Sequence, residues 1–154
     1  MKVVPTNKQI VQRYFNPQYQ SYWSQYNNVS FSGDTFFSYN TAIAKRVEGK
    51  YGRKILLLSD NRHSNTTAKH IFLLRCENNY CWDIVRVPTV RNERNIDIDV
   101  VIERLLDRLV ALRNQGLLAK YQYRKEFMEI RSMLWRINVF IKDVDVPQEL
   151  TQLD

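Results

Sequence analysis

The sequence predicts an α+β domain, in which a small, mainly antiparallel sheet with one short inserted helix is covered by a C-terminal antiparallel helical hairpin. Short runs of β-branched and aliphatic residues, separated by turn residues, lie within residues 29–88. Two apolar stripes at helical spacing follow within residues 95–142. The chain has 154 residues, which is enough for one hydrophobic core and short for two, so we expect a single domain.

Residues 1–28 form an N-terminal segment that is rich in aromatic and polar side chains. Within it, Ile10 and Val11 give a weak helical pattern that can begin after Pro5 and Thr6. We therefore expect this segment to start with a short helix.

Aromatic residues are concentrated between Tyr14 and Tyr39, an interval in which Asp34 is the only charged residue. One interpretation is a stacking platform for unpaired bases, in which each base contributes about 1 to 3 kcal/mol. The other is that the rings pack on the sheet and the Gln, Ser and Asn residues between them face water. We favour packing, because aromatic side chains bury large areas and dominate cores.

The first predicted strand of the central sheet follows a turn at Gly33 and Asp34. From Phe37 to Val47, larger side chains alternate with smaller and more polar ones. Such alternation is typical of one extended, half-buried segment.

A β-hairpin is predicted next, because the strands Thr41–Val47 and Arg53–Leu58 are separated by a loop that contains Gly49 and Gly52. The run Ile55–Leu58 is apolar on both faces. This run therefore suits a central strand of the sheet.

The inserted helix is predicted over Thr66–Glu77, since residues 64–67 offer several N-cap side chains directly before an apolar run. A further strand is expected over Tyr80–Val87. We expect Cys76 and Cys81 to be buried free thiols, because free cysteine behaves as a small buried hydrophobe.

Two helices are predicted in the last third of the chain. Asn95 or Asp97 can cap the first, and Gly116 suits the position just after its end. The second covers Leu118–Lys142, and the short connection between the two favours an antiparallel hairpin. Residues 143–154 form an acidic tail.

The net charge of +7 is spread unevenly along the chain. Residues 1–75 hold eleven Lys and Arg against three acidic residues, whereas residues 76–154 hold twelve against thirteen. A basic half of this kind favours a polyanionic partner, nucleic acid first. There is no apolar run of about 18 residues and no apolar core of a secretion signal near the start, so we expect a cytoplasmic protein without a membrane partner.

The strongest candidate site is the approach to the inserted helix, where unpaired backbone N–H groups and the helix dipole favour an anion. Hydroxyl groups add donors there, and basic side chains of the preceding hairpin add charge. The alternative is an ordinary helix cap beside solvated lysines. The predicted anion- or nucleic-acid-binding residues are Arg62, His63, Ser64, Thr66, Thr67, Lys69, His70, Lys45, Arg46, Lys50, Arg53 and Lys54.

The basic residues of the second long helix are a further surface that can follow a phosphate backbone, but we favour an ordinary solvated face. They are interrupted by Glu126 and Glu129. The basic residues are Lys120, Arg124, Lys125, Arg131 and Arg136.

No catalytic residue, metal site or cofactor is assigned. His63 and His70 are seven positions apart, and no glycine-rich phosphate loop accompanies them. Cys76 and Cys81 lack the partners that a zinc site or a disulfide framework needs.

Two segments resemble a family of small uncharacterised proteins from bacteriophages and other mobile elements. The segments are FFSYNTAIA at residues 36–44 and SDNRHSNTTAKH at residues 59–70, of which Ser-x-Thr-Thr-x-Lys-His is the more distinctive part. The resemblance implies a phage or mobile-element setting. It provides no catalytic or binding residue.

The sequence thus favours a non-enzymatic phage or mobile-element accessory protein that binds nucleic acid or a nucleoprotein through its basic N-terminal half. The alternative is a protein-directed inhibitor of a host defence system, of the anti-CRISPR or anti-restriction type. Less favoured is an enzyme that acts on a phosphorylated substrate at residues 64–70.

Overall fold

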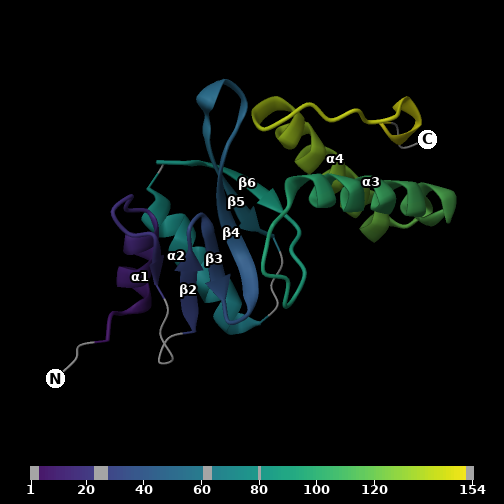
Figure 1. Ribbon diagram of the computed structural model, residues 1–154. Helices are drawn as coiled ribbons and strands as arrows, with labels where there is room; N and C mark the ends of the chain where they lie inside the picture. Colours follow the sequence, from purple (N-terminus) through teal and green to yellow (C-terminus); the bar gives the residue numbers. More distant parts are fainter. Residues whose placement is uncertain (1–3, 23–27, 61–63, 80, 152–154) are drawn as a thin grey trace. The chain divides into compact units, whose positions relative to one another are not determined.

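The computed structural model describes residues 4–22, 28–60, 64–79 and 81–151 (Figure 1). Backbone contacts divide the chain into two compact units. The first comprises residues 1–48 and 54–96, and the second comprises residues 49–53 and 97–154. The α+β class is confirmed, because the first unit holds a mostly antiparallel sheet with helices and the second holds the C-terminal helices.

The sheet of the first unit has six strands, which lie side by side in the order of the sequence. Each of the first five strands is antiparallel to its neighbour. Two-residue and five-residue connections join β2 to β3, β3 to β4 and β4 to β5, and connections this short allow only antiparallel pairing. The last pair is parallel, because the helix α2 (Asn65–Asn78) carries the chain back to the start of β6. The strands are β1 (Ser21–Tyr22), β2 (Val29–Ser32), β3 (Thr35–Ser38), β4 (Thr41–Glu48), β5 (Lys54–Ser59) and β6 (Asp83–Val87).

The prediction of one extended segment from Phe37 to Val47 is wrong. The chain reverses after Ser38, so that Ser38 pairs with Thr41 in a β3–β4 hairpin. The turn uses a left-handed backbone at Tyr39, with φ of 54°. A left-handed residue other than Gly or Asn is uncommon, so Tyr39 itself gives no turn signal, although Asn40 next to it is a common turn residue.

The β4–β5 hairpin is confirmed, with Glu48 opposite Lys54 across the loop. Its strands belong to the first unit and its tip, residues 49–53, to the second. Tyr51 at the tip is fully exposed and also has a left-handed backbone.

The helix α1 (Asn7–Tyr14) begins with a capping box, in which Thr6 and Gln9 satisfy each other's backbone N–H groups. This confirms the predicted start after Thr6. The helices α1 and α2 contact each other and cover one face of the sheet (Figure 1). The core between them contains Ile10, Val11, Tyr14, Val29, Phe31, Phe36, Ile43, Ala44, Leu56, Leu58, Ile71 and Leu74.

Three of the clustered aromatic rings belong to this core and those of Phe15 and Tyr22 pack against it, which confirms the packing interpretation for them. The rings of Phe31 and Phe36 meet the buried ring of Tyr14 edge-on, at centroid distances of 5.6 and 5.2 Å. Tyr19 and Tyr39 are exposed. Trp23 and Tyr26 lie outside the described residues.

Arg46 is a predicted binding residue that lies inside the first unit. Its Nη1 donates to the Tyr14 carbonyl and its Nη2 to the Gly33 carbonyl, both at 2.8 Å. The guanidinium carbon lies 4.5 Å from the centroid of the Tyr14 ring, and the side chain is 13% exposed. Asp34 lies 3.6 Å from Nη2. Arg46 therefore joins β4 to the end of α1 and to the β2–β3 turn.

Tyr14 completes this junction. Its hydroxyl donates to the Asp34 carbonyl at 2.6 Å. Burial raises the pKa of the Tyr14 phenol, so this group stays a donor.

The second unit contains the helices α3 (Ile98–Asn114) and α4 (Tyr121–Phe140), with a short 3-10 helix, η2 (Leu117–Ala119), between them. Asp97 caps α3, as predicted, by accepting from the backbone N–H groups of residues 99 and 100. Gly116 has the left-handed backbone that is favoured just after a helix.

Each helix of the second unit buries the apolar stripe that its spacing predicts. Arg108 of α3 donates to both carboxylate oxygens of Glu126 on α4, at 2.6 and 3.1 Å. Asp99 and Lys142 form a further ion pair, and the hairpin-tip residue Lys50 pairs with Asp143. The buried residues are Val101, Leu105, Leu109 and Leu112 in α3 and Phe127, Ile130, Leu134 and Ile137 in α4.

Among the described residues, no helix combines the length and apolar character that crossing a bilayer requires. The prediction that Cys76 and Cys81 are buried is wrong, because both are exposed free thiols. Cys76 lies near the end of α2, and Cys81 follows that helix by three residues.

We expect Arg46→Lys to destabilise the protein by about 2 kcal/mol or more, since one ammonium group cannot replace two charged hydrogen bonds to separate carbonyls. Urea unfolding followed by circular dichroism measures this. Arg91→Lys, at an exposed position, is the matched control. Equal midpoints for the two variants would show that the Arg46 junction carries no stability.

Candidate functional site

The start of α2 is built from hydroxyl groups that bind one another. Ser64 is the N-cap, and its Oγ accepts from the Thr67 backbone N–H at 3.1 Å. The same Oγ lies 3.1 Å from Thr67 Oγ1. The predicted cap is confirmed at Ser64, and it fixes the first turn of α2.

This cap continues into a buried polar network that joins α2 to β3. Ser38 Oγ lies 3.0 Å from Thr67 Oγ1 and 2.7 Å from Nδ1 of His70. Ser38 and His70 are 1% and 4% exposed. The half-exposed ring of Tyr39 lies 6.2 Å from the imidazole, centroid to centroid.

A serine hydroxyl within hydrogen-bonding distance of an imidazole is a feature of nucleophilic catalysis. Here the Ser38–His70 pair is buried, so a substrate has no direct access to it. Burial also lowers the pKa of His70, which keeps the ring neutral and suits a hydrogen bond to a hydroxyl. The arrangement therefore fastens α2 to the sheet.

The predicted residues around the start of α2 consequently divide into two groups. Ser64, Thr67 and His70 are engaged in the network. Lys69 is exposed and Thr66 is half-buried. Arg62 and His63 lie outside the described residues.

The predicted basic residues of the hairpin are held by other side chains. Lys45 donates to Asn95 Oδ1 at 3.0 Å and to the Ile96 carbonyl at 3.3 Å. The ammonium group of Lys54 lies 5.6 Å from the centroid of the Trp82 ring. Both contacts tie strands of the sheet to neighbouring segments of the first unit.

Two predicted residues, Lys50 and Arg53, belong to the second unit. Lys50 pairs with Asp143, and Arg53 lies 4.8 Å from the centroid of the Phe140 ring. Both therefore join the hairpin tip to the end of α4.

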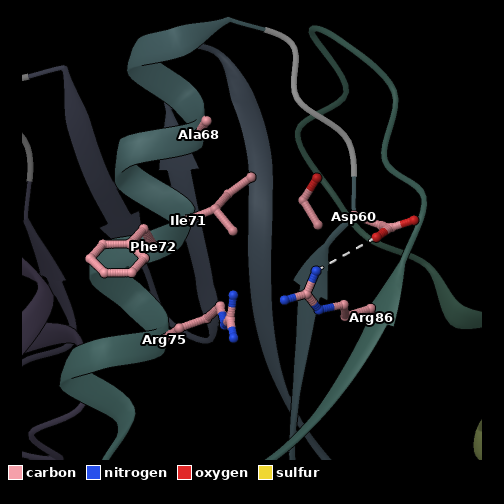
Figure 2. A pocket seen from close by; sticks show the side chains of 7 residues that line it. Asp60, Ala68, Ile71, Phe72, Arg75 and Arg86 are labelled. Atoms are coloured by element: carbon pink, nitrogen blue, oxygen red, sulfur yellow. Dashed lines mark ion pairs between the residues drawn. The ribbon is translucent and has the colours of Figure 1, made fainter.

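A groove that the sequence did not indicate lies between α2 and the ends of β5 and β6 (Figure 2). Its volume is about 110 Å³. The guanidinium groups of Arg75, from α2, and Arg86, from β6, both point into it. The groove is lined by Ser59, Asp60, Ala68, Ile71, Phe72, Arg75 and Arg86.

The groove carries surplus positive charge. Asp60 lies 3.8 Å from Arg86, so one carboxylate faces two guanidinium groups. Phe72 is 64% exposed on the rim. Lys69 precedes Phe72 by three positions, which places it on the same side of α2. Phe72 therefore lies at the edge of the groove, and its ring is turned away from the two guanidinium groups (Figure 2).

The position of the groove follows from the parallel pairing of β5 with β6. Asp60 comes directly after β5, and Arg86 is next to the last residue of β6. Ligands of parallel β-α-β units bind outside the carboxyl ends of the strands. The order of strand, helix and strand in the sequence could have indicated this groove. Phe72 and Arg75 lie three positions apart on the helix of that unit.

Among residues 4–22, 28–60, 64–79 and 81–151, no group of three His, Cys, Asp or Glu side chains has the arrangement that could hold a metal ion.

Residues 6–80 match the model of a family of unknown function, DUF8033. The matched range contains the Ser38–His70 network and, from the groove, Phe72 and Arg75, but it ends before Arg86. Comparison with curated proteins and with solved structures gives no match. The resemblance to phage and mobile-element proteins stays a prediction.

We expect Ser38→Ala to destabilise the protein by about 1 to 3 kcal/mol, because it removes a partner from both Thr67 and His70 in a buried setting. The shift of the urea midpoint measures this effect. Ser32→Ala, at an exposed position of β2, is the control and should leave the midpoint in place. A similar midpoint for both variants would mean that the network does not hold α2.

Stability should also depend on the protonation of His70. Because burial lowers its pKa in the folded protein, the unfolded chain binds this proton more readily. The contribution to stability is therefore complete above the ordinary histidine pKa of about 6.5 and is lost as the pH falls below it. Urea unfolding at a series of pH values should show a flatter profile for His70→Asn than for the wild-type protein.

His63→Asn is the matched control, since it removes the other histidine of the chain. It should preserve the wild-type pH profile. If His70→Asn and the wild-type protein lose stability in parallel, His70 is not the group responsible.

Proposed function

We propose that the protein is a non-enzymatic accessory protein that binds single-stranded nucleic acid in the groove beside α2. The observation that carries this proposal is the pair of guanidinium groups of Arg75 and Arg86 in one groove, with the exposed residue Phe72 at its edge. A phage or mobile-element origin and action in the host cytoplasm belong to the same proposal.

Two guanidinium groups suit a phosphate. Arginine presents several N–H donors in one plane and can bind two oxygens of a phosphate at once. Asp60 neutralises one of the two charges, so one positive charge of Arg75 and Arg86 is left for an anion. Lys69 is exposed on the same helix but lies outside the lining of the groove.

Phe72 supports a single-stranded ligand. A base can stack on an exposed ring only when its own face is free, as in an unpaired strand. Such stacking accepts every base, so we expect little sequence preference. In this proposal Arg75 and Arg86 bind the phosphates, and Phe72 stacks on a base.

The groove residues Arg75 and Arg86 are proposed contacts in place of some of the basic residues that the sequence predicted. Arg46 and Lys45 serve the fold of the first unit, whereas the contact through Lys69 stays a prediction. Contacts through Thr66 and Lys54 stay predictions. The protein acts without catalysis in this proposal, since the Ser38–His70 pair is buried.

We also infer that α3 and α4 form the predicted antiparallel hairpin. The pairs Arg108–Glu126 and Asp99–Lys142 support this arrangement, because they join the middle of α3 to the first half of α4 and the start of α3 to the end of α4. Whether the hairpin covers the sheet stays a prediction.

Binding of a fluorescein-labelled single-stranded oligonucleotide, followed by anisotropy at several salt concentrations, tests the groove. Phe72→Ala should weaken binding by about 5- to 160-fold, which corresponds to about 1 to 3 kcal/mol of stacking free energy. Replacing Arg75 and Arg86 with Ala should reduce the slope of log affinity against log salt by about 0.7 for each phosphate that is no longer bound.

The matched controls lie at exposed positions outside the groove. Tyr51→Ala removes a fully exposed ring, and Arg91→Ala removes one exposed charge. Both should bind like the wild-type protein. Absence of binding at low salt would overturn the proposal, and so would an equal reduction of affinity in Phe72→Ala and Tyr51→Ala.

Cys76 provides a local readout, since it lies four positions after Phe72 and is exposed. In a Cys81→Ser background, a thiol-reactive dye on Cys76 should change its emission when the oligonucleotide binds. A duplex of the same sequence should bind more weakly. If the duplex binds as tightly as the single strand, stacking of a base on Phe72 does not contribute to binding.

A further inference from the structure

Helix α4 exposes an apolar stripe on the side away from its buried residues. Tyr121, Met128 and Trp135 are 80%, 55% and 61% exposed. Val139 is exposed as well. Single exposed apolar residues are ordinary, but these four share one side of one helix.

Their spacing makes the stripe continuous. Tyr121, Met128 and Trp135 follow one another at intervals of seven, and Val139 lies four positions after Trp135. Residues seven apart lie almost in line along a helix, and this interval is the repeat of a helix–helix seam. From Tyr121 to Val139 the stripe is about 27 Å long. That length matches a partner helix of about five turns.

The borders of the stripe are basic. Among the described residues, the four basic residues of α4 take part in no ion pair of the structure. Of the two acidic residues in α4, Glu126 is held by Arg108 and only Glu129 faces this side. The four basic residues are Arg124, Lys125, Arg131 and Arg136.

This charge pattern distinguishes the possible occupants. A second copy of the chain would bring the same basic borders together, and like charges across an interface cost free energy. A bilayer needs a broader apolar face, whereas Lys125 and Ser132 interrupt this stripe. Nucleic acid would cover the apolar side chains with phosphates.

We propose that this stripe of α4 docks an amphipathic helix of a partner protein, with an apolar seam bordered by Asp and Glu. Trp135 is the anchor, because large aromatic side chains contribute most at helix interfaces, and Met128 adapts its shape to the partner. The proposal goes beyond nucleic-acid binding, since it concerns the second unit and different residues. A protein-directed inhibitor would use such a surface without chemistry of its own.

The test uses full-length protein and a synthetic acidic peptide of about 21 residues, with Leu at heptad spacing and Glu at the bordering positions. Fluorescence anisotropy of the labelled peptide should show saturable binding. Trp135→Ala should weaken it by at least about tenfold. Arg124→Glu with Arg131→Glu should weaken it similarly and reduce its dependence on salt.

Three controls make the result specific. Phe72→Ala should bind the peptide like the wild-type protein. A peptide with Lys in place of Glu should not bind. Trp135→Ala should keep the wild-type thermal unfolding curve, since Trp135 is 61% exposed, and should keep wild-type affinity for the single-stranded oligonucleotide. The two proposals can therefore fail independently.

Several outcomes would overturn the docking proposal. The first is that the acidic peptide does not bind. The second is that Trp135→Ala binds it as tightly as the wild-type protein, and the third is that the Lys peptide binds as tightly as the Glu peptide. Binding to phosphatidylserine vesicles that Trp135→Ala abolishes, without peptide binding, would assign the stripe to a membrane surface. A dimer in sedimentation that the same variant dissociates would assign it to a second copy.

Discussion

The first unit depends on the burial of one cation. Arg46 can leave water because two backbone carbonyls and the face of Tyr14 replace its hydration, and an unpaired charge at that position would cost several kcal/mol. The carbonyls come from the end of α1 and from the β2–β3 turn, so the position of α1 is set by β4. Because α1 packs on α2, the same contact supports the helix that carries Phe72 and Arg75.

Positive charge in this chain therefore serves two purposes. Arg46, Lys45 and Lys54 lie against carbonyls or rings and hold strands to their neighbours. Arg75 and Arg86 are exposed and line one groove, whereas Lys69 is exposed outside its lining. The excess of basic residues before Cys76 pointed to a polyanion, yet part of that excess stabilises the fold. A binding surface follows from which cations are exposed together, rather than from net charge.

Periodicity and turn glycines were sufficient to predict the β4–β5 hairpin and the buried stripes of α3 and α4, and the polar side chains of residues 64–67 indicated a helix cap there without selecting Ser64. The β3–β4 reversal was missed because Tyr39 is left-handed without being glycine. The exposure of Cys76 and Cys81 was missed because the prediction assumed that they are buried, as free cysteines in proteins usually are. The groove was missed because Arg75 and Arg86 meet only through the parallel pairing of β5 with β6, which local patterns do not reveal. The single domain stays a prediction.

The tip of the β4–β5 hairpin has a consequence for biosynthesis. Lys50 and Arg53 find their partners, Asp143 and Phe140, about 90 residues later in the chain. On the ribosome, the strands of the first unit are complete long before those partners are made. The second unit can therefore close only after residues 140–143 have been made, and a chain that terminates before them would carry the tip with Lys50 and Arg53 uncovered.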